Sequence, residues 1–283
     1  MKRGCVIGYD INEKGCQISY YDDSMEEPDT MMASSNNYLI PLVLGYFKDR
    51  WVFGKEAKRL AVVGEDCTET DLYGKAKRRE KVSLAGKTYD AVWLLAKYIS
   101  LTLQDFENIQ YLTFTTPETD VDMAKMLKGI GQHIGVDKEI INVQDYKESF
   151  CQYMIFQPKE LWQYESALFY CDEDRIKAYM LRRLRVDASH GMNSFVTVDE
   201  VANAQRKELE ALYPIMNKEK SPDESFKSMI ENVFEKKVIS SVYLTGEGFE
   251  KNWYPNSLRV LCNGRRAFMG NNLYSKGACY KSI

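Results

Sequence analysis

An aspartate ends the first apolar run of the chain, in a turn that also offers groups for binding an anion. The segment "VIGYDINEKGCQIS", residues 6–19, has the pattern of a strand, a polar turn and a second strand. In such a turn Asp10 can accept backbone N–H groups, which is a structural role. Lys14 can pair with an anion, and Gly15 lets the backbone N–H groups of the turn approach one. The residue types therefore allow both a structural turn and a phosphate-binding one.

A second acidic turn lies in the other half of the chain, at "CDEDR", residues 171–175. It contains three carboxylates, Asp172, Glu173 and Asp174, and no glycine. Each carboxylate would repel a triphosphate at ~4 Å by about 1 kcal/mol even in water. Bridging divalent ions could offset this repulsion, or the turn could point away from a ligand. We favour a charged, solvated hairpin turn over a metal site.

Two further places have residues that could serve a nucleotide. Gly246 and Gly248 follow a predicted strand, where glycines allow a ligand to approach the backbone closely or simply form a tight turn. Glu148 stands at the start of a predicted helix. A carboxylate there also stabilises the helix dipole, so its position alone does not imply catalysis.

The elements that must position these residues alternate along the chain. Each half begins with a β-hairpin whose turn is acidic, at residues 4–21 and 165–186, and continues with helices and strands. This pattern predicts a duplicated α/β fold with a cleft between its halves. We expect strands over 109–117, 139–145, 238–249 and part of 258–270, and helices over 90–106, 120–135, 147–157, 198–216 and 222–237.

Composition narrows the class of protein. The 283 residues are 45% hydrophobic and 28% charged, as in an ordinary globular protein, and the net charge is −3. No apolar run approaches the ~20 residues of a membrane span, so we expect a cytoplasmic protein without membrane contact. The seven cysteines form no C-x-x-C pair and the chain has two histidines, which leaves little material for a metal centre.

Segments spread over nearly the whole chain resemble the actin, sugar-kinase and heat-shock-chaperone ATPase superfamily. They are "GYDIN" (8–12), "IPLVLGYFKDRWVFGKEAKR" (40–59), the run from "YLTFTTPETD" to "KESFCQYMIF" (111–156), "SSVYLTGEGF" (240–249) and "GACY" (277–280). The resemblance implies duplicated ribonuclease-H-like domains with mixed sheets flanked by helices, an actin-like ATPase fold. The signatures "ESF", "LTGEGF" and "NLYSKGACY" are most similar to a group of uncharacterised bacterial actin-like proteins.

The resemblance also implies roles for the residues above. Asp10 would hold the magnesium of a nucleotide through water, and Glu148, or Asp145 in a shifted alignment, would position the attacking water. The remaining nucleotide-binding positions would belong to the first loop, the second loop and the adenosine turn. They are Asn12, Lys14, Gly15, Asp172, Gly246 and Gly248.

Both phosphate loops depart from the superfamily pattern. Asn12 stands where the superfamily prefers glycine, and Glu13 adds a negative charge beside it. The second loop lacks the glycines that follow its aspartate in active members. We therefore expect that the chain has kept the fold and has lost phosphate binding.

The boundaries follow from the same comparison. We expect a first lobe over 1–160 and a reduced second lobe over 161–283, with the final helix returning to the first lobe. The subdomain that the superfamily inserts in the second lobe would be missing or reduced to the helix predicted at 198–216.

These observations favour a degenerate actin-like or chaperone-ATPase-like protein that binds other proteins or itself as a scaffold and does not hydrolyse ATP. The alternative is an active ATPase or small-molecule kinase that uses ATP and Mg²⁺ with unusual loops. We expect no tightly bound cofactor. A nucleic-acid-binding role is the least favoured, because it rests only on the basic strip "GKAKRREK", residues 74–81, which lacks interleaved aromatic residues.

Overall fold

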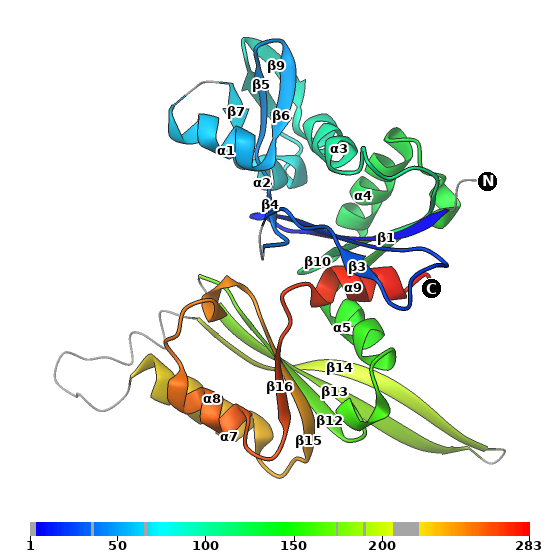
Figure 1. The fold of residues 1–283 in the computed structure, drawn as a ribbon, viewed down its shortest axis with the longest axis vertical. Helices are drawn as coiled ribbons and strands as arrows, with labels where there is room; N and C mark the ends of the chain where they lie inside the picture. The colour runs from blue at the N-terminus through cyan, green and yellow to red at the C-terminus, as the bar shows by residue number, and fades with distance from the viewer. Residues whose placement is uncertain (1–3, 35–36, 65–66, 174, 189–190, 206–220) are drawn as a thin grey trace. The chain divides into compact units, whose positions relative to one another are not determined.

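The computed structural model divides the chain into two compact units, which are described separately (Figure 1). Unit 1 comprises Met1–Ser149 and Tyr274–Ile283, and unit 2 comprises Phe150–Leu273. Each unit combines a mixed sheet with helices, which confirms the α/β class. The structure describes residues 4–34, 37–64, 67–173, 175–188, 191–205 and 221–283.

The main sheet of unit 1 has the strand order β11-β10-β1-β2-β3, and β4 also pairs with β2. β1 is antiparallel to β2 and parallel to β10, which is parallel to β11. The hairpin turn between β1 and β2 lies where the polar residues predicted it. The strands are β1 (Cys5–Ile11), β2 (Gly15–Tyr21), β3 (Asp29–Thr30), β4 (Ile40–Pro41), β10 (Ile109–Thr116) and β11 (Ile141–Asp145).

Smaller elements fill the chain between β4 and β10. Two of the three strands in a second sheet, β5 and β6, form a hairpin whose turn contains Lys48 and Asp49, and β8 pairs with β9. The strands are β5 (Leu44–Phe47), β6 (Arg50–Phe53), β7 (Thr68–Glu69), β8 (Lys81–Leu84) and β9 (Lys87–Asp90). The helices that begin in unit 1 are α1 (Gly54–Val62), α2 (Leu72–Lys77), α3 (Ala91–Thr102), α4 (Val121–His133) and α5 (Tyr146–Ile155).

The two faces of β1 have different neighbours, because alternate side chains of a strand point to opposite faces. Ile7 and Tyr9 are fully buried in the core that α3 and α4 complete, and Figure 1 shows both helices on one face of this sheet. The other face carries Gly8 and Asp10 and receives α9 (Leu273–Tyr280). A Cβ on Gly8 would lie 2.1 Å from the carbonyl oxygen of Ser275, so glycine is required for this close packing.

The sheet of unit 2 has the order β14-β13-β12-β15-β16. β12 is antiparallel to β13 and parallel to β15, β13 is antiparallel to β14, and β15 is parallel to β16. Helices α7 and α8 contribute to its core. The elements are β12 (Glu165–Cys171), β13 (Arg175–Ala188), β14 (Gly191–Gln205), α7 (Pro222–Phe234), β15 (Ile239–Thr245), α8 (Pro255–Leu261) and β16 (Arg266–Met269).

The two sheets agree in register as well as in order. In the first hairpin Val6 pairs with Tyr21, and in the second Ser166 pairs with Leu181, so equivalent positions are 160 residues apart. The pairing of each central strand with its parallel neighbour also has a register shift at an equivalent place. The shift lies between Cys5 and Val6 in β1 and between Glu165 and Ser166 in β12. Strand order, strand direction, the register of the first hairpin and the irregularity of the central strand are therefore the same in both units.

The helix predicted over 198–216 is wrong in the part that the structure describes, because β14 continues to Gln205 and pairs residue by residue with β13. Val201, Ala202 and Ala204 pack against the core of unit 2 from this strand. Pairing and burial thus override the helix propensity of an Ala- and Glu-rich segment. Residues 206–216 lie outside the described part of the chain.

The strand predicted within 258–270 is only partly correct. α8 occupies the first part of this segment, and β16 begins at Arg266. Pro255 stands at the first position of α8, where its missing N–H costs no hydrogen bond. The carboxylate of Asp223 accepts the N–H groups of Asn256 and Ser257 at 2.8 Å each, which caps the helix from a distance in sequence.

Helices α5 and α9 each follow the last strand of one sheet. Tyr146 and Ser149 of α5 belong to unit 1, whereas Phe150 and the rest of α5 belong to unit 2, where Phe150 packs edge-on against Tyr243 at 6.1 Å. Most of α9, from Tyr274 onward, belongs to unit 1. Among the described residues, no helix has both the length and the apolar character that a membrane crossing requires.

Candidate functional site

Buried polar side chains gather at the carboxyl ends of the parallel strands of unit 1. Asp10 and Gln144 lie one residue before the ends of β1 and β11, and Thr115 and Thr116 end β10. All four are at most 4% exposed. Ligands of α/β sheets bind at such strand ends, so this edge is the candidate functional site of the chain.

A hydrogen-bond chain of three side chains organises the site. The amide of Asn12 donates to the hydroxyl of Tyr146 at 3.1 Å, and this hydroxyl donates to Oδ1 of Asp10 at 2.8 Å. The ring of Tyr146 stacks on that of Tyr274 with centroids 3.7 Å apart and planes 7° apart. Because the ring is fixed by this stacking, its hydroxyl is held against the carboxyl group.

Burial changes the acidity of Asp10. Its removal from water raises the pKa to about 7, while the hydrogen bond from Tyr146 works in the opposite direction. A carboxyl group with this pKa exchanges its proton near neutral pH. It can therefore act as a hydrogen-bond donor or acceptor, and as a proton acceptor, depending on pH.

A second network lies beside it at the start of α5. The hydroxyl of Ser149 lies 2.6 Å from that of Thr115 and accepts the amide N–H of Gln144 at 2.7 Å. A Cβ on Gly277 of α9 would lie 2.0 Å from the carbonyl oxygen of Ser149, so the two helices pack backbone to backbone here. This packing holds the start of α5 in place. Tyr146, which contacts Asp10, is thereby positioned as well.

The first loop is closed by its own side chain. Oδ1 of Asn12 accepts the backbone N–H of Lys14 at 2.9 Å and that of Gly15 at 3.3 Å. These are N–H groups of the kind that a phosphate cradle must present to its ligand. Lys14 and Glu13 are both exposed. The loop that was predicted to bind phosphate therefore has the hydrogen bonding of an Asx turn.

The second loop repeats this arrangement. Oδ1 of Asp172 accepts the N–H of Arg175 at 2.7 Å, and the N–H of Asp172 donates to the carbonyl of Arg175 at 3.0 Å. By strand register Asp172 corresponds to Asn12, and Tyr170 occupies the position of Asp10. Asp174 lies outside the described residues. The second loop thus has no carboxylate at the position that Asp10 holds in the first.

Glu148 caps its own helix. Its N–H donates to Oδ1 of Asp145 at 2.9 Å, and its Oε2 accepts the N–H of Asp145 at 3.4 Å. This reciprocal pair is a capping box, which satisfies N–H groups at the start of a helix. Both predicted candidates for positioning a water molecule, Glu148 and Asp145, are engaged in this cap, and Glu148 is exposed.

The glycines after β15 pack against their own strand neighbour. Gly246 has φ +94°, and a Cβ on it would lie 2.2 Å from the carbonyl oxygen of Cys171. A Cβ on Gly248 would lie 2.2 Å from the Sγ atom of Cys171. Trp253 donates its ring N–H to the carbonyl of Gly248 at 2.7 Å. Contact with Cys171 therefore explains why glycine occupies these two positions.

Two of the five cations in the basic strip of residues 74–81, Lys75 and Arg78, are paired with carboxylates. Lys75 pairs with Glu69 at 2.8 Å. Arg78 pairs with Asp71 at 2.9 Å and with Glu80 at 2.6 Å. The strip consequently offers less positive charge to a polyanion than its sequence indicates.

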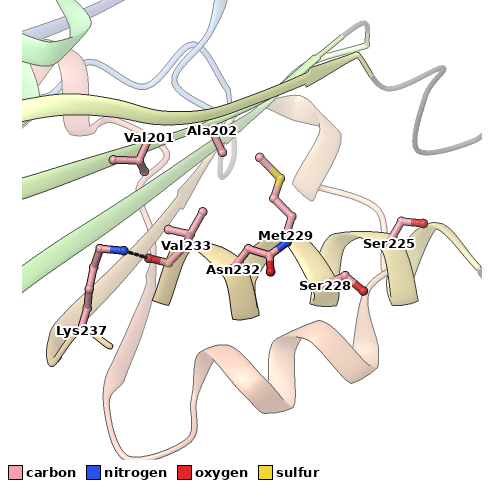
Figure 2. Close-up of a pocket in the computed structure, with 8 residues that line it drawn as sticks. All are labelled: Val201, Ala202, Ser225, Ser228, Met229, Asn232, Val233 and Lys237. Carbon is pink, nitrogen blue, oxygen red and sulfur yellow. Dashed lines mark hydrogen bonds between the residues drawn. The ribbon is translucent and has the colours of Figure 1, made fainter. Parts of the chain in front are cut away.

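A separate cavity of about 360 Å³ lies in unit 2 between β14 and α7 (Figure 2). Val201 and Ala202 face Met229 and Val233 across it, so its walls are mainly apolar. Lys237 donates from Nζ to the carbonyl of Val233 at 2.6 Å. The lining residues are Val201, Ala202, Ser225, Ser228, Met229, Asn232, Val233 and Lys237.

The sequence missed the two tyrosines that define the site. Tyr146 is 136 residues from Asp10 and comes from another element, and no spacing pattern links it to Tyr274. A search of the described residues finds no group of three or more His, Cys, Asp or Glu side chains placed to hold a metal ion. The site of unit 1 thus combines one titratable carboxyl group with tyrosine and amide partners.

Comparison with known proteins adds one match. A model of the family described as "Family of unknown function (DUF5716) C-terminal" matches residues 27–283, from just before β3 to the end of the chain. The matched range contains Tyr146 and Tyr274, and Asp10 and Asn12 precede it. No curated protein matches the chain.

Proposed function

The chain belongs to the DUF5716 C-terminal family of unknown function, and from its geometry we propose that it is a degenerate actin-like protein that binds other proteins and does not hydrolyse ATP. The common strand order, register and irregularity of the two sheets support duplicated ribonuclease-H-like lobes. The fold alone does not specify the activity. We infer the loss of hydrolysis from the two loops.

The observation that carries the proposal is the closure of both turns by their own side chains. Asn12 holds two backbone N–H groups of the first loop, and Asp172 holds one of the second. A phosphate would have to displace these oxygens before it could bind the same N–H groups. In the second loop it would also meet the carboxylates of Asp172 and Glu173.

The surroundings of Asp10 support the same proposal. In an active superfamily member this carboxylate would hold a hydrated magnesium ion, which favours an ionised and accessible group. Here Asp10 is 4% exposed, accepts the hydroxyl of Tyr146 and has a pKa of about 7. A group that is partly protonated at neutral pH is a weak ligand for Mg²⁺.

The alternative is an active Mg-ATP-dependent enzyme. It is favoured by Asp10 itself, which stands near the end of β1 where the superfamily has its metal-binding aspartate, and by the exposed Lys14. In that case Tyr146 would have to release the carboxyl group when nucleotide binds. The two proposals therefore differ in whether the protein binds and hydrolyses Mg-ATP.

Thermal unfolding with and without Mg-ATP separates them. At a ligand concentration about a hundredfold above Kd, a site present only in the folded state adds about 2.7 kcal/mol of stability. This corresponds to a rise in Tm of about 5 °C or more. We expect less than about 1 °C with about 5 mM Mg-ATP and no phosphate release above a blank. A rise of several degrees that Lys14→Ala abolishes, together with phosphate release above a blank, would establish the alternative.

A matched variant tests the cause. Asn12→Gly removes the oxygen that occupies the two N–H groups of the first loop, and glycine is also what the superfamily prefers there. If closure of the loop excludes phosphate, this variant should gain a small Mg-ATP-dependent rise in Tm. The control is Asn203→Gly, which alters an exposed asparagine in unit 2.

A further inference from the structure

β14 is a long strand at the edge of a sheet. It spans 15 residues and is the last strand in the order of the unit 2 sheet. Its counterpart in unit 1, β3, has two residues. An edge strand presents a row of backbone N–H and C=O groups that can pair with another strand. Such an edge is commonly short, as β3 is, but β14 is not.

The sequence of β14 lacks the basic residues and prolines that commonly protect an edge strand from pairing. The strand "GMNSFVTVDEVANAQ" contains no Lys, Arg or Pro, which are the residues that commonly block an exposed edge. Val196, Thr197 and Val198 are β-branched residues in sequence, which favour the extended conformation. Asp199 and Glu200 follow them and supply the acidic side chains of this strand.

Part of β14 lies in a ribbon of only two strands. The pairing of β12 with β13 ends at Leu181, whereas β13 and β14 remain paired from there to the end of the hairpin. Leu184 and Phe195 lie opposite each other in this ribbon and are 48% and 56% exposed. A two-stranded ribbon is marginally stable in water, and further strands that cover its apolar residues stabilise it.

We propose that β14 pairs antiparallel with β14 of a second copy of this chain, with the two-fold axis at Val196. The two ribbons would then form one four-stranded sheet in the order β13, β14, β14 and β13. This inference rests on the proposed protein-binding role and names a second copy of the chain as the partner. The pairing itself would hold whether or not the protein binds ATP.

The register follows from symmetry and charge. In an antiparallel pair with two-fold symmetry, directly opposite residues share a face, so their numbers add to an even sum. With the axis at Val196, this residue meets itself and Phe195 meets Thr197 of the second copy, an aromatic and β-branched pair that stabilises sheets. No acidic residue then faces another.

The neighbouring registers are less favourable. An axis at Thr197 would place Phe195 opposite Asp199, and an axis at Val198 would place Thr197 opposite Asp199. β14 is also irregular at Val201, where the register with β13 shifts between Tyr179 and Ala178. The regular stretch Gly191–Glu200 has its middle beside Val196, which agrees with the proposed axis.

Molar mass in solution tests the proposal. We expect a dimer at about 100 μM protein by sedimentation equilibrium. Val196→Lys should make it a monomer, because two lysines would meet at the axis. The control Asn203→Lys adds the same charge beyond the irregularity, at an exposed residue of the same strand, and should stay dimeric. A monomeric wild type, or a Val196→Lys variant that remains dimeric with an unchanged Tm, overturns the proposal.

Cross-linking tests the register. In a Cys262→Ser background, which removes the exposed cysteine, Val196→Cys should oxidise to a disulfide-linked dimer. Opposite Cβ atoms in such a pair lie about 4.5–5.5 Å apart, close enough for a disulfide after small adjustments. Asn203→Cys should remain uncross-linked. A dimer that forms through another surface would leave Val196→Cys unlinked and would overturn the proposal, and neither result depends on nucleotide.

Discussion

The main sheets of unit 1 and unit 2 have the same strand order and strand directions but different residues at the ends of their strands. Positions 160 residues apart pair in the same way, yet Asp10 of unit 1 corresponds to Tyr170 of unit 2, and the glycine that closes the first turn corresponds to Arg175. Backbone pairing depends on main-chain hydrogen bonds and on an alternating apolar face, and many sequences satisfy both. The chemistry at the strand ends depends on single side chains, so the two properties can diverge.

The edge strands of the two sheets, β3 and β14, also differ. In unit 1 the chain leaves the short β3 and builds two small sheets before α3, whereas in unit 2 the long β14 leads toward α7. Unit 1 therefore has a buried polar site at its strand ends, and unit 2 has an extended edge. Four experiments can sharpen or break this contrast.

The largest effect is expected at the turn after β15. Gly246 has φ +94°, and a Cβ there would lie 2.2 Å from the carbonyl oxygen of Cys171. The corresponding residue of unit 1, which follows the last residue of β10 that pairs with β1, is Thr116. Gly246→Ala should lower the free energy of unfolding by about 4 kcal/mol or more. Urea unfolding followed by circular dichroism measures it.

Gly264 provides the control for backbone strain. It has φ +71° and no atom within 4 Å of a built Cβ, so Gly264→Ala should cost only about 1 kcal/mol. Equal losses for the two variants would mean that the contact with Cys171 contributes nothing.

The second largest effect is expected in the capping of the corresponding helices α8 and α4. Asp223 is 4% exposed and accepts three hydrogen bonds from Asn256 and Ser257 at the start of α8. Asp120 caps α4 from the adjacent position through one bond to Met123 at 2.7 Å. Asp223→Ala should therefore cost about 3 kcal/mol and Asp120→Ala about 1 kcal/mol. Equal costs, measured by urea unfolding, would remove this difference between the units.

The carboxyl group of Asp10 should make stability fall as the pH rises. Its folded pKa of about 7 exceeds the unfolded value, so between about pH 4 and 7 the folded chain holds a proton that the unfolded chain has lost. Each pH unit in this window costs up to about 1.4 kcal/mol. We expect a loss of about 2 kcal/mol between pH 5.5 and 7 that Asp10→Asn abolishes.

Two variants complete the pH experiment. Tyr146→Phe removes the hydrogen bond that lowers the pKa of Asp10, so the loss should extend to higher pH. Asp172→Asn, in the corresponding turn of unit 2, is the control and should leave the slope unchanged. A slope that persists in Asp10→Asn would show that another group causes it.

The smallest effects are expected in the turns. Asn12→Ala loses two accepted N–H bonds and the donation to Tyr146, so it should cost about 1.5 kcal/mol. Asp172→Ala loses one bond to the N–H of Arg175 and should cost about 0.5 kcal/mol. Thermal unfolding measures both. A larger loss for Asp172 would contradict the view that only the first turn supports a buried site.

Local patterns predicted most of the secondary structure. The hairpin around residues 12–14, the helix that begins at Pro222 and the strand before Gly246 all stand where turn residues, a helix cap and apolar periodicity predicted them. The strand Gly191–Gln205 was missed because its Ala and Glu residues favour a helix locally. Its pairing partner β13 lies in another segment, whose effect on conformation no local window includes.

The candidate site was predicted only in part. Asp10 was found because it ends an apolar run. Gly246 and Gly248, which were predicted because they follow a strand, belong to unit 2 and pack against Cys171. By strand register Asp172 corresponds to Asn12, whereas Tyr170 occupies the position of Asp10. The acidic residues of the two turns therefore differ in position by two residues, and the sequence alone does not show this because hydrogen bonds between the strands set the register.

By itself, the sequence determined where most strands, turns and helices form, because these depend mainly on residues within a few positions of one another. Tertiary structure alone decided that Tyr146 covers Asp10, that Cys171 requires the glycines after β15, and that β14 lies at the edge of its sheet. Each of these depends on burial and on atoms brought together from distant segments. Acidity, close packing and pairing are properties of that environment, which the order of residues does not display.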